Sequence, residues 1–278
     1  MKPLLQFGIA IVVICVGVHS SRSEESVAGN IKTEIRTTRH PNGRLKEQWA
    51  IMIVDNKDVR SGVYQSWYED GVEQTQGSYA NDKENGIWRS WHPNGLPAYQ
   101  RTYQMGLLQG IEYSWTKTGA QHGVVPYENN EKHGFVIHYG ENKRPLASWG
   151  EYVHDKLNGP LIDWYPSGQL WVVANYENGL RQGPYTKWFE SGVVQVMTFY
   201  RNGEFHGRRR EWNKNGVCRE DQTYEGGKRH GSSTSYFDSG QIHEKGEFVA
   251  DKKNGLWVTY DENGDLISER TFENGVPK

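Results

Sequence analysis

The chain has 278 residues, of which 35 % are hydrophobic and 13 % are aromatic, and its formal net charge is −2. The many aromatic residues exclude a disordered chain, and the slightly acidic charge gives no general attraction to nucleic acid. The hydrophobic content is low for a spherical core, and the repeat described below indicates one elongated domain in place of two globules.

Residues 1–23 are predicted to be a signal peptide. Lys2 provides a positive start, and residues 4–18 form an apolar run of 15 residues, which is short for a membrane-spanning helix. Small residues at 18–20 or 21–23 offer a cleavage site. We therefore predict an exported protein of the periplasm, cell envelope or extracellular space. The alternative is an uncleaved N-terminal anchor.

Cleavage after residue 23 removes Lys2 and Arg22, which changes the formal net charge from −2 to −4. It also removes Cys15 and leaves Cys218 as the single cysteine. An intramolecular disulfide is then excluded. Cys218 falls in an apolar column of the repeat described below, so a buried, unreactive thiol is expected.

Residues 24–33 are predicted to be a flexible leader, and residues 34–61 a degenerate capping repeat. This unit begins at Glu34, and its sequence His40-Pro41-Asn42-Gly43 matches the first turn of the regular units. Gly43 lies 28 residues before Gly71, which implies an insertion of four residues. The apolar stretch 50–54 is expected to form a capping strand over the open end of the array.

Nine regular units follow over residues 62–278. Each unit begins at a frame glycine, which we number position zero. Successive frame glycines are 24 residues apart except for one step of 25. A fixed period of this length indicates a repeat architecture. The frame glycines are Gly62, Gly86, Gly110, Gly134, Gly159, Gly183, Gly207, Gly231 and Gly255.

Two aromatic columns run through the nine units. Position five holds Trp67, Trp91, Trp115, Tyr139, Trp164, Trp188, Trp212, Tyr236 and Tyr260. The second column, near position seventeen, holds Tyr79, Tyr103, Tyr127, Tyr152, Tyr176, Tyr200, Tyr224, Phe248 and Phe272. Together they account for 18 of the 35 aromatic residues, which predicts that they build the core.

Each unit contains two turn sequences. His92-Pro93-Asn94-Gly95 is typical of a type I turn closed by a glycine bulge, and Asn178-Gly179 is a strong hairpin signal. The segments between the turns are rich in Val, Ile, Thr, Trp and Tyr, as strands are. The predicted fold is all-β: tandem 24-residue hairpins in one elongated, twisted antiparallel sheet.

Closing the first turn as a bulged hairpin places position five opposite position eleven. Alternation along a strand then predicts that positions one, three and five share a buried face with positions eleven and seventeen. The mostly apolar residues of position one, such as Ile87 and Leu256, support this choice.

The face opposite this predicted core varies between units and is the candidate binding surface. Exposed aromatic residues on a rigid face are typical of binding sites, and the alternative is that another layer covers some of them. Arg208, Arg209 and Arg210, followed one unit later by Lys228 and Arg229, form a candidate basic cluster or a solvated charged strand. The predicted partner-binding residues are Tyr64, Trp88, Tyr185, Arg208, Arg209, Arg210 and Trp257.

The units Asn85-Gly-x4-Trp91-x3-Gly95-x7-Tyr103 and His206-Gly-x4-Trp212-x3-Gly216-x7-Tyr224 resemble MORN repeats, most of all the bacterial variant labelled an antitoxin component. The resemblance covers about residues 34–278. It implies an array of β-hairpins that contacts proteins or membrane surfaces and performs no chemistry. The antitoxin label implies a cytoplasmic toxin partner.

The sequence predicts no enzyme, no cofactor and no metal site. His133, His206 and His230 each precede a frame glycine where other units have Asn or Gln, which indicates a turn role. Metal-ligand spacings such as Cys-x2-Cys or His-Glu-x-x-His are missing, and no glycine-rich loop leads into a helix to bind phosphate.

The predicted function is therefore an exported, non-enzymatic scaffold, a monomer, that binds a protein in the envelope or outside the cell. The rival prediction is a module that docks on anionic lipid or cell-wall glycan, and a third is an antitoxin-like inhibitor of an exported toxin. Cell-wall-binding repeats place their aromatic residues side by side, whereas Trp91 and Tyr103 are twelve residues apart. This spacing favours the protein-binding scaffold.

Overall fold

The computed structural model describes residues 32–140 and 147–278, all in strands and turns. The predicted signal peptide and most of the predicted leader lie outside the described residues. No helix in the described ranges is long and apolar enough to cross a membrane. The strands are β1 Lys32–Arg39, β2 Leu45–Val54, β3 Lys57–Trp67, β4 Glu73–Ala80, β5 Lys83–Glu84, β6 Gly86–Trp91, β7 Pro97–Gln104, β8 Leu107–Leu108, β9 Gly110–Trp115, β10 Gln121–Glu128, β11 Glu131–Lys132, β12 Gly134–His138, β13 Ser148–Val153, β14 Lys156–Trp164, β15 Leu170–Glu177, β16 Leu180–Arg181, β17 Gly183–Trp188, β18 Val194–Arg201, β19 Glu204–Phe205, β20 Gly207–Trp212, β21 Cys218–Glu225, β22 Lys228–Tyr236, β23 Ile242–Val249, β24 Lys252–Tyr260, β25 Leu266–Glu273 and β26 Val276–Pro277.

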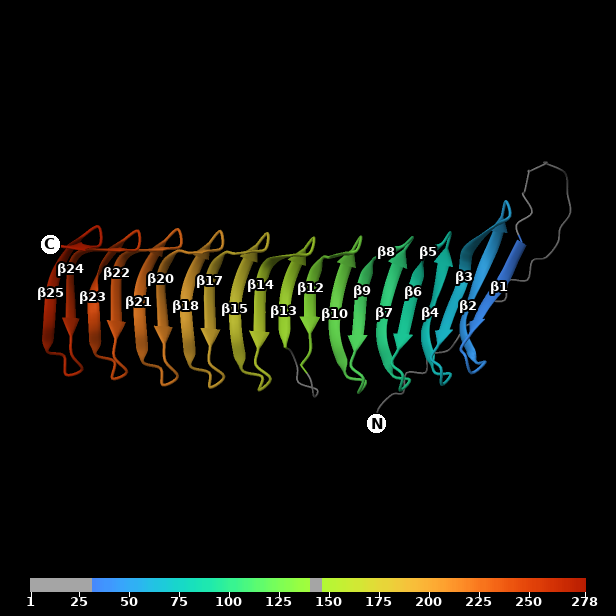
Figure 1. Cartoon of the computed structure of the whole chain (residues 1–278), viewed down its shortest axis with the longest axis horizontal. Coiled ribbons are helices and arrows are strands. Elements are labelled where there is room, and N and C mark those ends of the chain that lie inside the picture. The colour runs from blue at the N-terminus through green and yellow to red at the C-terminus, as the bar shows by residue number, and fades with distance from the viewer. Residues whose placement is uncertain (1–31, 141–146) are drawn as a thin grey trace, which may run out of the picture.

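The strands form one open antiparallel sheet in which each long strand pairs with the long strands before and after it in the chain, while two-residue strands such as β5 pair only with the strand before them. β1 pairs with β2, β2 with β3, β3 with β4, and the same meander continues to β24 and β25. Figure 1 shows the result, a single elongated layer that runs from β1 at one end to β25 at the other. The all-β prediction of tandem hairpins in one long sheet is confirmed.

The two predicted turns have the expected backbone conformations. In the first, the Gly95 amide donates to the His92 carbonyl at 2.8 Å, and Gly95 has φ +79°, which L-residues with a side chain rarely adopt. In the second, Asn178 and Gly179 both have positive φ, 51° and 85°. Two consecutive positive φ values match the right-handed twist of a hairpin, so the turn residues determine where the strands on either side end.

The predicted division into faces is wrong, although the pairing on which it rested is correct. Trp91 does lie opposite Pro97, which is position five opposite position eleven, but the register shifts between Ser90 and Trp91. Beyond this bulge Gly86 lies opposite Tyr103, so position zero pairs with seventeen and position two with fifteen. One extra residue in a strand moves every later side chain to the other face of the sheet.

The two aromatic columns consequently lie on opposite faces. Trp115 contacts Tyr113 of position three, and the Arg210 guanidinium lies over Trp212, so position five shares a face with position three. Tyr79 of position seventeen instead contacts Tyr64 and Trp88, both at position two. We call these the tryptophan face (positions one, three, five, fourteen and sixteen) and the tyrosine face (positions two, four, thirteen, fifteen and seventeen).

The first hairpin differs from the regular units as the insertion predicts. β1 begins at Lys32, two residues before the predicted start of the capping repeat. β2 and β3 pair out to Val54 and Lys57, so the four extra residues lengthen each of the two strands by two. Residues 50–54 were expected to form the capping strand at the open end of the array. They lie instead within β2, between β1 and β3, and β1 is the strand at the edge of the sheet. Ile51 replaces the column aromatic and is 1 % exposed.

Candidate functional site

Position two, the row that we expected to be exposed, is instead part of the packed interior of the tyrosine face. Trp88 is 8 % exposed and Trp257 only 3 %. The Trp88 ring lies flat over Gly77, where an added Cβ would come within 2.1 Å of the ring, and its Nε1 donates to the Ser78 carbonyl at 3.2 Å. Trp88 and Trp257 therefore do not form an open binding surface.

The variation at position two follows the residue at position fifteen of the preceding unit. Glycine faces a tryptophan at Gly77–Trp88 and again at Gly246–Trp257, where the added Cβ would lie 2.4 Å from the ring. Arg101 donates to Glu112 at 2.5 Å. A small residue at position fifteen thus faces a large one at position two, and a basic residue faces an acidic one. Much of the variation at position two therefore matches the size or charge of the residue it packs against. The paired variation is visible in the sequence once the register is known.

The remaining predicted aromatic residues, Tyr64 and Tyr185, are half-buried. Tyr64 packs against Tyr79 and Trp88 with ring centroids 5.8 and 5.5 Å apart, and Tyr185 packs edge-on against Tyr200 at 5.6 Å. Burial is the main cause that raises the pKa of both phenols. These tyrosines stay neutral hydrogen-bonding groups at the surface of the tyrosine face.

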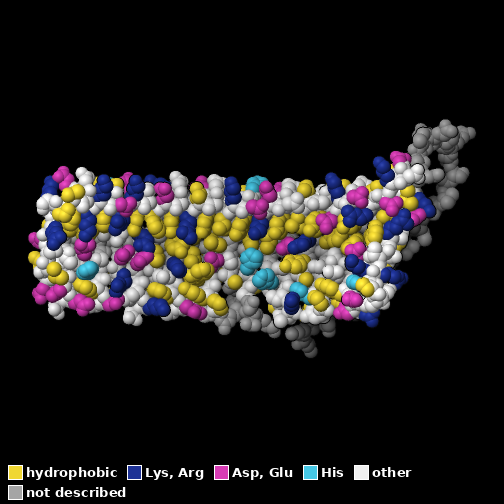
Figure 2. All heavy atoms as spheres, in the orientation of Figure 1, with side chains coloured by type: hydrophobic (Ala, Val, Ile, Leu, Met, Phe, Trp, Pro, Cys, Tyr) yellow, Lys and Arg dark blue, Asp and Glu magenta, His cyan; other side chains and the backbone are white. Residues whose placement is uncertain are grey.

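Cations lie on the aromatic rings along the tyrosine face. The Arg229 guanidinium stands 4.0 Å from the Phe248 ring centre, and the Lys253 ammonium 3.9 Å from that of Trp257. Figure 2 shows one side of the molecule, where a band of hydrophobic side chains runs along the long axis with Lys and Arg side chains among them. Cation–π contacts of this kind fix the long basic side chains in place.

The predicted basic cluster at residues 208–210 does not form. Successive residues of β20 point to opposite faces, so Arg209 lies on the tyrosine face over Phe205, while Arg210 lies on the tryptophan face over Trp212. Arg208 is exposed, but its Nε donates to Asp221 at 2.7 Å, and Arg209 pairs with Glu211 and Glu220. Alternation and neighbouring acids divide and neutralise the charge that looks continuous in the sequence.

The tryptophan face carries the apolar row that we expected in the core. Position one is about half exposed in the first four regular units: Val63 at 53 %, Ile87 at 47 %, Ile111 at 43 % and Phe135 at 48 %. The Phe135 ring stacks on Trp149 at 5.0 Å and 10°. Position one continues as Pro160 and Pro184, then turns polar at Arg208 and Ser232. We call Val63, Ile87, Ile111 and Phe135 the outer apolar row.

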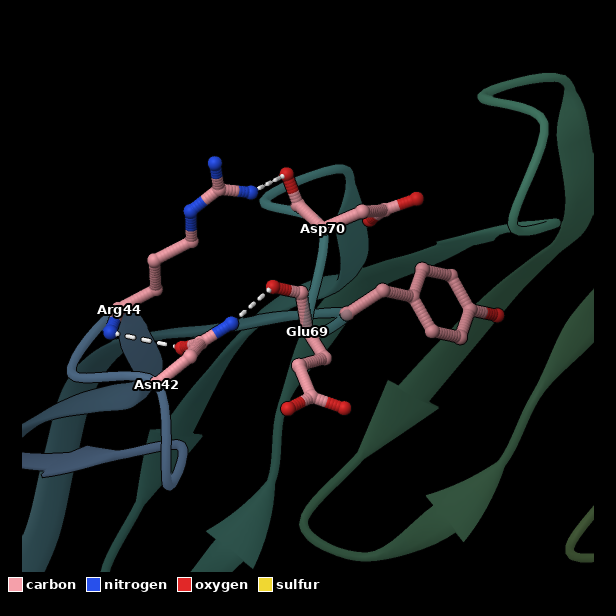
Figure 3. A pocket seen from close by; sticks show the side chains of 5 residues that line it. Asn42, Arg44, Glu69 and Asp70 are labelled. Carbon is pink, nitrogen blue, oxygen red and sulfur yellow. Dashed lines mark hydrogen bonds between the residues drawn. The ribbon is translucent and has the colours of Figure 1, made fainter.

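The hollow drawn in Figure 3 lies between neighbouring first turns. The Asn42 amide donates to the Glu69 carbonyl at 2.9 Å and Arg44 donates to the Asp70 carbonyl. Similar bonds join later turns, for example Tyr68 Oη to the Trp91 carbonyl at 2.9 Å. The polar groups here already bind one another, so this edge stabilises the stacking of units.

A metal centre requires a grouping of titratable side chains. Within the described ranges no three His, Cys, Asp or Glu side chains are placed to hold a metal ion. Cys218 is half-buried, and burial raises the pKa of its thiol, as expected for an unreactive cysteine. His133 lies 3.7 Å from Glu128 and packs against His154.

An open array of tandem hairpins defines the class of repeat proteins. Five segments match the family model described as a MORN repeat variant: residues 84–105, 157–178, 181–202, 229–250 and 253–274. MORN repeats are generally scaffolds that bind proteins or membrane lipids, and they are not typically enzymatic. The match does not extend to the antitoxin label. A search of curated proteins found no match.

Proposed function

We propose that the chain is an exported, non-enzymatic scaffold that binds a protein partner through the outer apolar row. The observation that carries the proposal is the exposure of Val63, Ile87, Ile111 and Phe135, at 43–53 %, on a sheet that no other described layer covers. Exposed apolar side chains in contiguous order are typical of protein contacts.

The geometry of the row favours an elongated partner. Each unit contributes two strands at about 4.8 Å, so successive members of the row stand about 10 Å apart. The row is rigid, because turns and paired strands fix each residue, and a rigid surface loses little entropy on binding. In this proposal the protein is exported and acts as a monomer. A narrower form of the proposal is that the partner is an exported toxin, which the protein inhibits.

The lipid- or glycan-binding alternative has less support. A membrane surface is attracted by several unpaired basic residues close together, whereas Arg208 and Arg209 are paired with acids and lie on opposite faces. Affinity for a protein on the outer apolar row should change little with salt. Binding that falls steeply as salt rises would favour the alternative.

Capture from an envelope extract tests the proposal. We expect the double variant Ile87→Ser, Ile111→Ser to lose the captured partner while its circular dichroism spectrum stays unchanged. Leu256→Ser is the matched control: it is also at position one and 53 % exposed, but Arg208 and Ser232 separate it from the row. Equal capture by the double variant and the wild type would contradict the proposal.

A further inference from the structure

The cations that lie on rings of the tyrosine face mostly have a carboxylate partner. Arg60 pairs with Asp82 at 3.4 Å, Arg229 with Asp251 at 3.2 Å and Lys253 with Glu244 at 2.5 Å. Two members of this set have no carboxylate within salt-bridge distance among the described residues: Lys132, which lies over Tyr152, and Arg181.

Arg181 is surrounded by neutral hydroxyl groups in place of a carboxylate. Its Nε donates to Tyr176 Oη at 3.3 Å and its Nη1 to Tyr200 Oη at 3.2 Å. The guanidinium also lies over the rings of Tyr185 and Tyr200, 5.1 and 5.2 Å from their centres. Each tyrosine oxygen accepts from Arg181, so each keeps its own hydrogen to donate to another acceptor.

Two of the three buried side-chain polar atoms that have no hydrogen-bond partner among the described residues lie in the same stretch of the tyrosine face. Thr198 Oγ1 and Arg209 Nε are buried and have no hydrogen-bond partner within the described ranges. Thr198 lies opposite Tyr185 in the β17–β18 pair. Phe205 lies between Tyr200, which contacts Arg181, and Arg209. Its ring centroid is 4.9 Å from that of Tyr200 and 5.2 Å from the Arg209 guanidinium. Buried polar groups normally have partners, so the hydrogen-bonding capacity of this stretch is not used up.

We propose that Arg181, Tyr176 and Tyr200 form a binding site for a phosphate or sulfate group of a soluble ligand. The guanidinium has five N–H donors, of which two are used, and the two phenols add two more. This number exceeds what one carboxylate accepts and suits a tetrahedral oxyanion. A single unpaired arginine is too little charge to hold a membrane surface. The site lies on the face opposite the outer apolar row and does not depend on it.

The experiment is a titration with inorganic phosphate, and separately sulfate, followed by NMR of the arginine Nε–Hε groups. We expect the Arg181 resonance to shift with saturation. Arg181→Gln should weaken phosphate binding about tenfold or more, as for loss of a charged hydrogen bond. Tyr200→Phe should weaken it less, because it removes one donor and leaves the charge.

Arg229→Gln is the matched control, since Arg229 occupies the same repeat position over an aromatic ring but is paired with Asp251. It should leave phosphate affinity unchanged. Equal weakening by Arg181→Gln and Arg229→Gln, or no saturable shift of Arg181, would overturn the site.

Binding to vesicles of phosphatidic acid in phosphatidylcholine is the second part of the experiment. Vesicle binding that is lost in Arg181→Gln, without binding of free phosphate, would overturn the soluble ligand.

Discussion

At the scale of single residues, two neighbours in β6 have exchanged the roles that their types suggest. Trp88 looks like a recognition residue but is packed over Gly77, and Ile87 looks like a core residue but is 47 % exposed. We expect Trp88→Ala to reduce the free energy of unfolding by about 3–5 kcal/mol. Ile87→Ala should reduce it by less than about 1 kcal/mol. Denaturant titration measures both, and equal losses would contradict the face assignment.

His138 should make the protein sensitive to mild acid. Burial, and secondarily the charge of His122, lowers the pKa of His138 below its ordinary value of 6.5. As the pH falls, His138 is protonated in the unfolded chain before it is protonated in the folded protein. The contribution of neutral His138 to the free energy of unfolding is therefore fully present above about pH 6.5 and is lost below it.

We expect His138→Gln to lose less stability than the wild type between pH 7 and the lowered pKa of His138, in denaturant titrations at several pH values. His243→Gln, at an exposed histidine, is the control and should follow the wild type. Parallel curves for His138→Gln and the wild type would show that His138 does not cause the effect.

At the scale of elements, neighbouring units recognise one another through positions fifteen and two. Gly77 in β4 leaves room for Trp88 in β6, and an added Cβ would come within 2.1 Å of that ring. Gly77→Ala should therefore cost about 1–3 kcal/mol, as overpacking does. In a Trp88→Ala background we expect most of this cost to disappear. A double-mutant cycle measures the coupling, and additive losses would contradict it.

The strands, the turns and the order of pairing could all be predicted from the sequence, because they depend on local chemistry that repeats in every unit. Pro93-Asn94-Gly95 and Asn178-Gly179 specify their turns wherever they stand. The faces could not be predicted in the same way. The faces depend on one bulge residue, Ala98, which lies between Pro97, the partner of Trp91, and Tyr99, the partner of Ser90. An error of one residue at this point exchanges the two faces.

The proposed binding surfaces were harder to predict because they depend on those faces. The sequence pointed to Trp88 and Trp257, which are buried, and overlooked the exposure of Phe135. No signal in the sequence indicated the proposed site at Arg181, because what distinguishes this arginine is that no described carboxylate pairs with it and two tyrosine hydroxyls do. That property belongs to the arrangement of several strands and not to a motif. Arg209 and Tyr185 were among the predicted residues, and they lie beside this site.

At the scale of the whole molecule, both proposed sites require a single open layer, because a compact particle would cover one face. Ten hairpins of two strands at about 4.8 Å give a sheet on the order of 90 Å long. Figure 1 shows the same elongated arrangement. Each unit contacts only its neighbours in such an array, so both faces stay available along its length.

Small-angle X-ray scattering of the protein beginning at Glu24 tests this claim most directly. A single layer of this length predicts a radius of gyration of about 28 Å, with a distance distribution that extends to about 90 Å or beyond. A radius of gyration of about 18 Å, as expected for a compact chain of this size, would contradict the open sheet and both binding surfaces that depend on it.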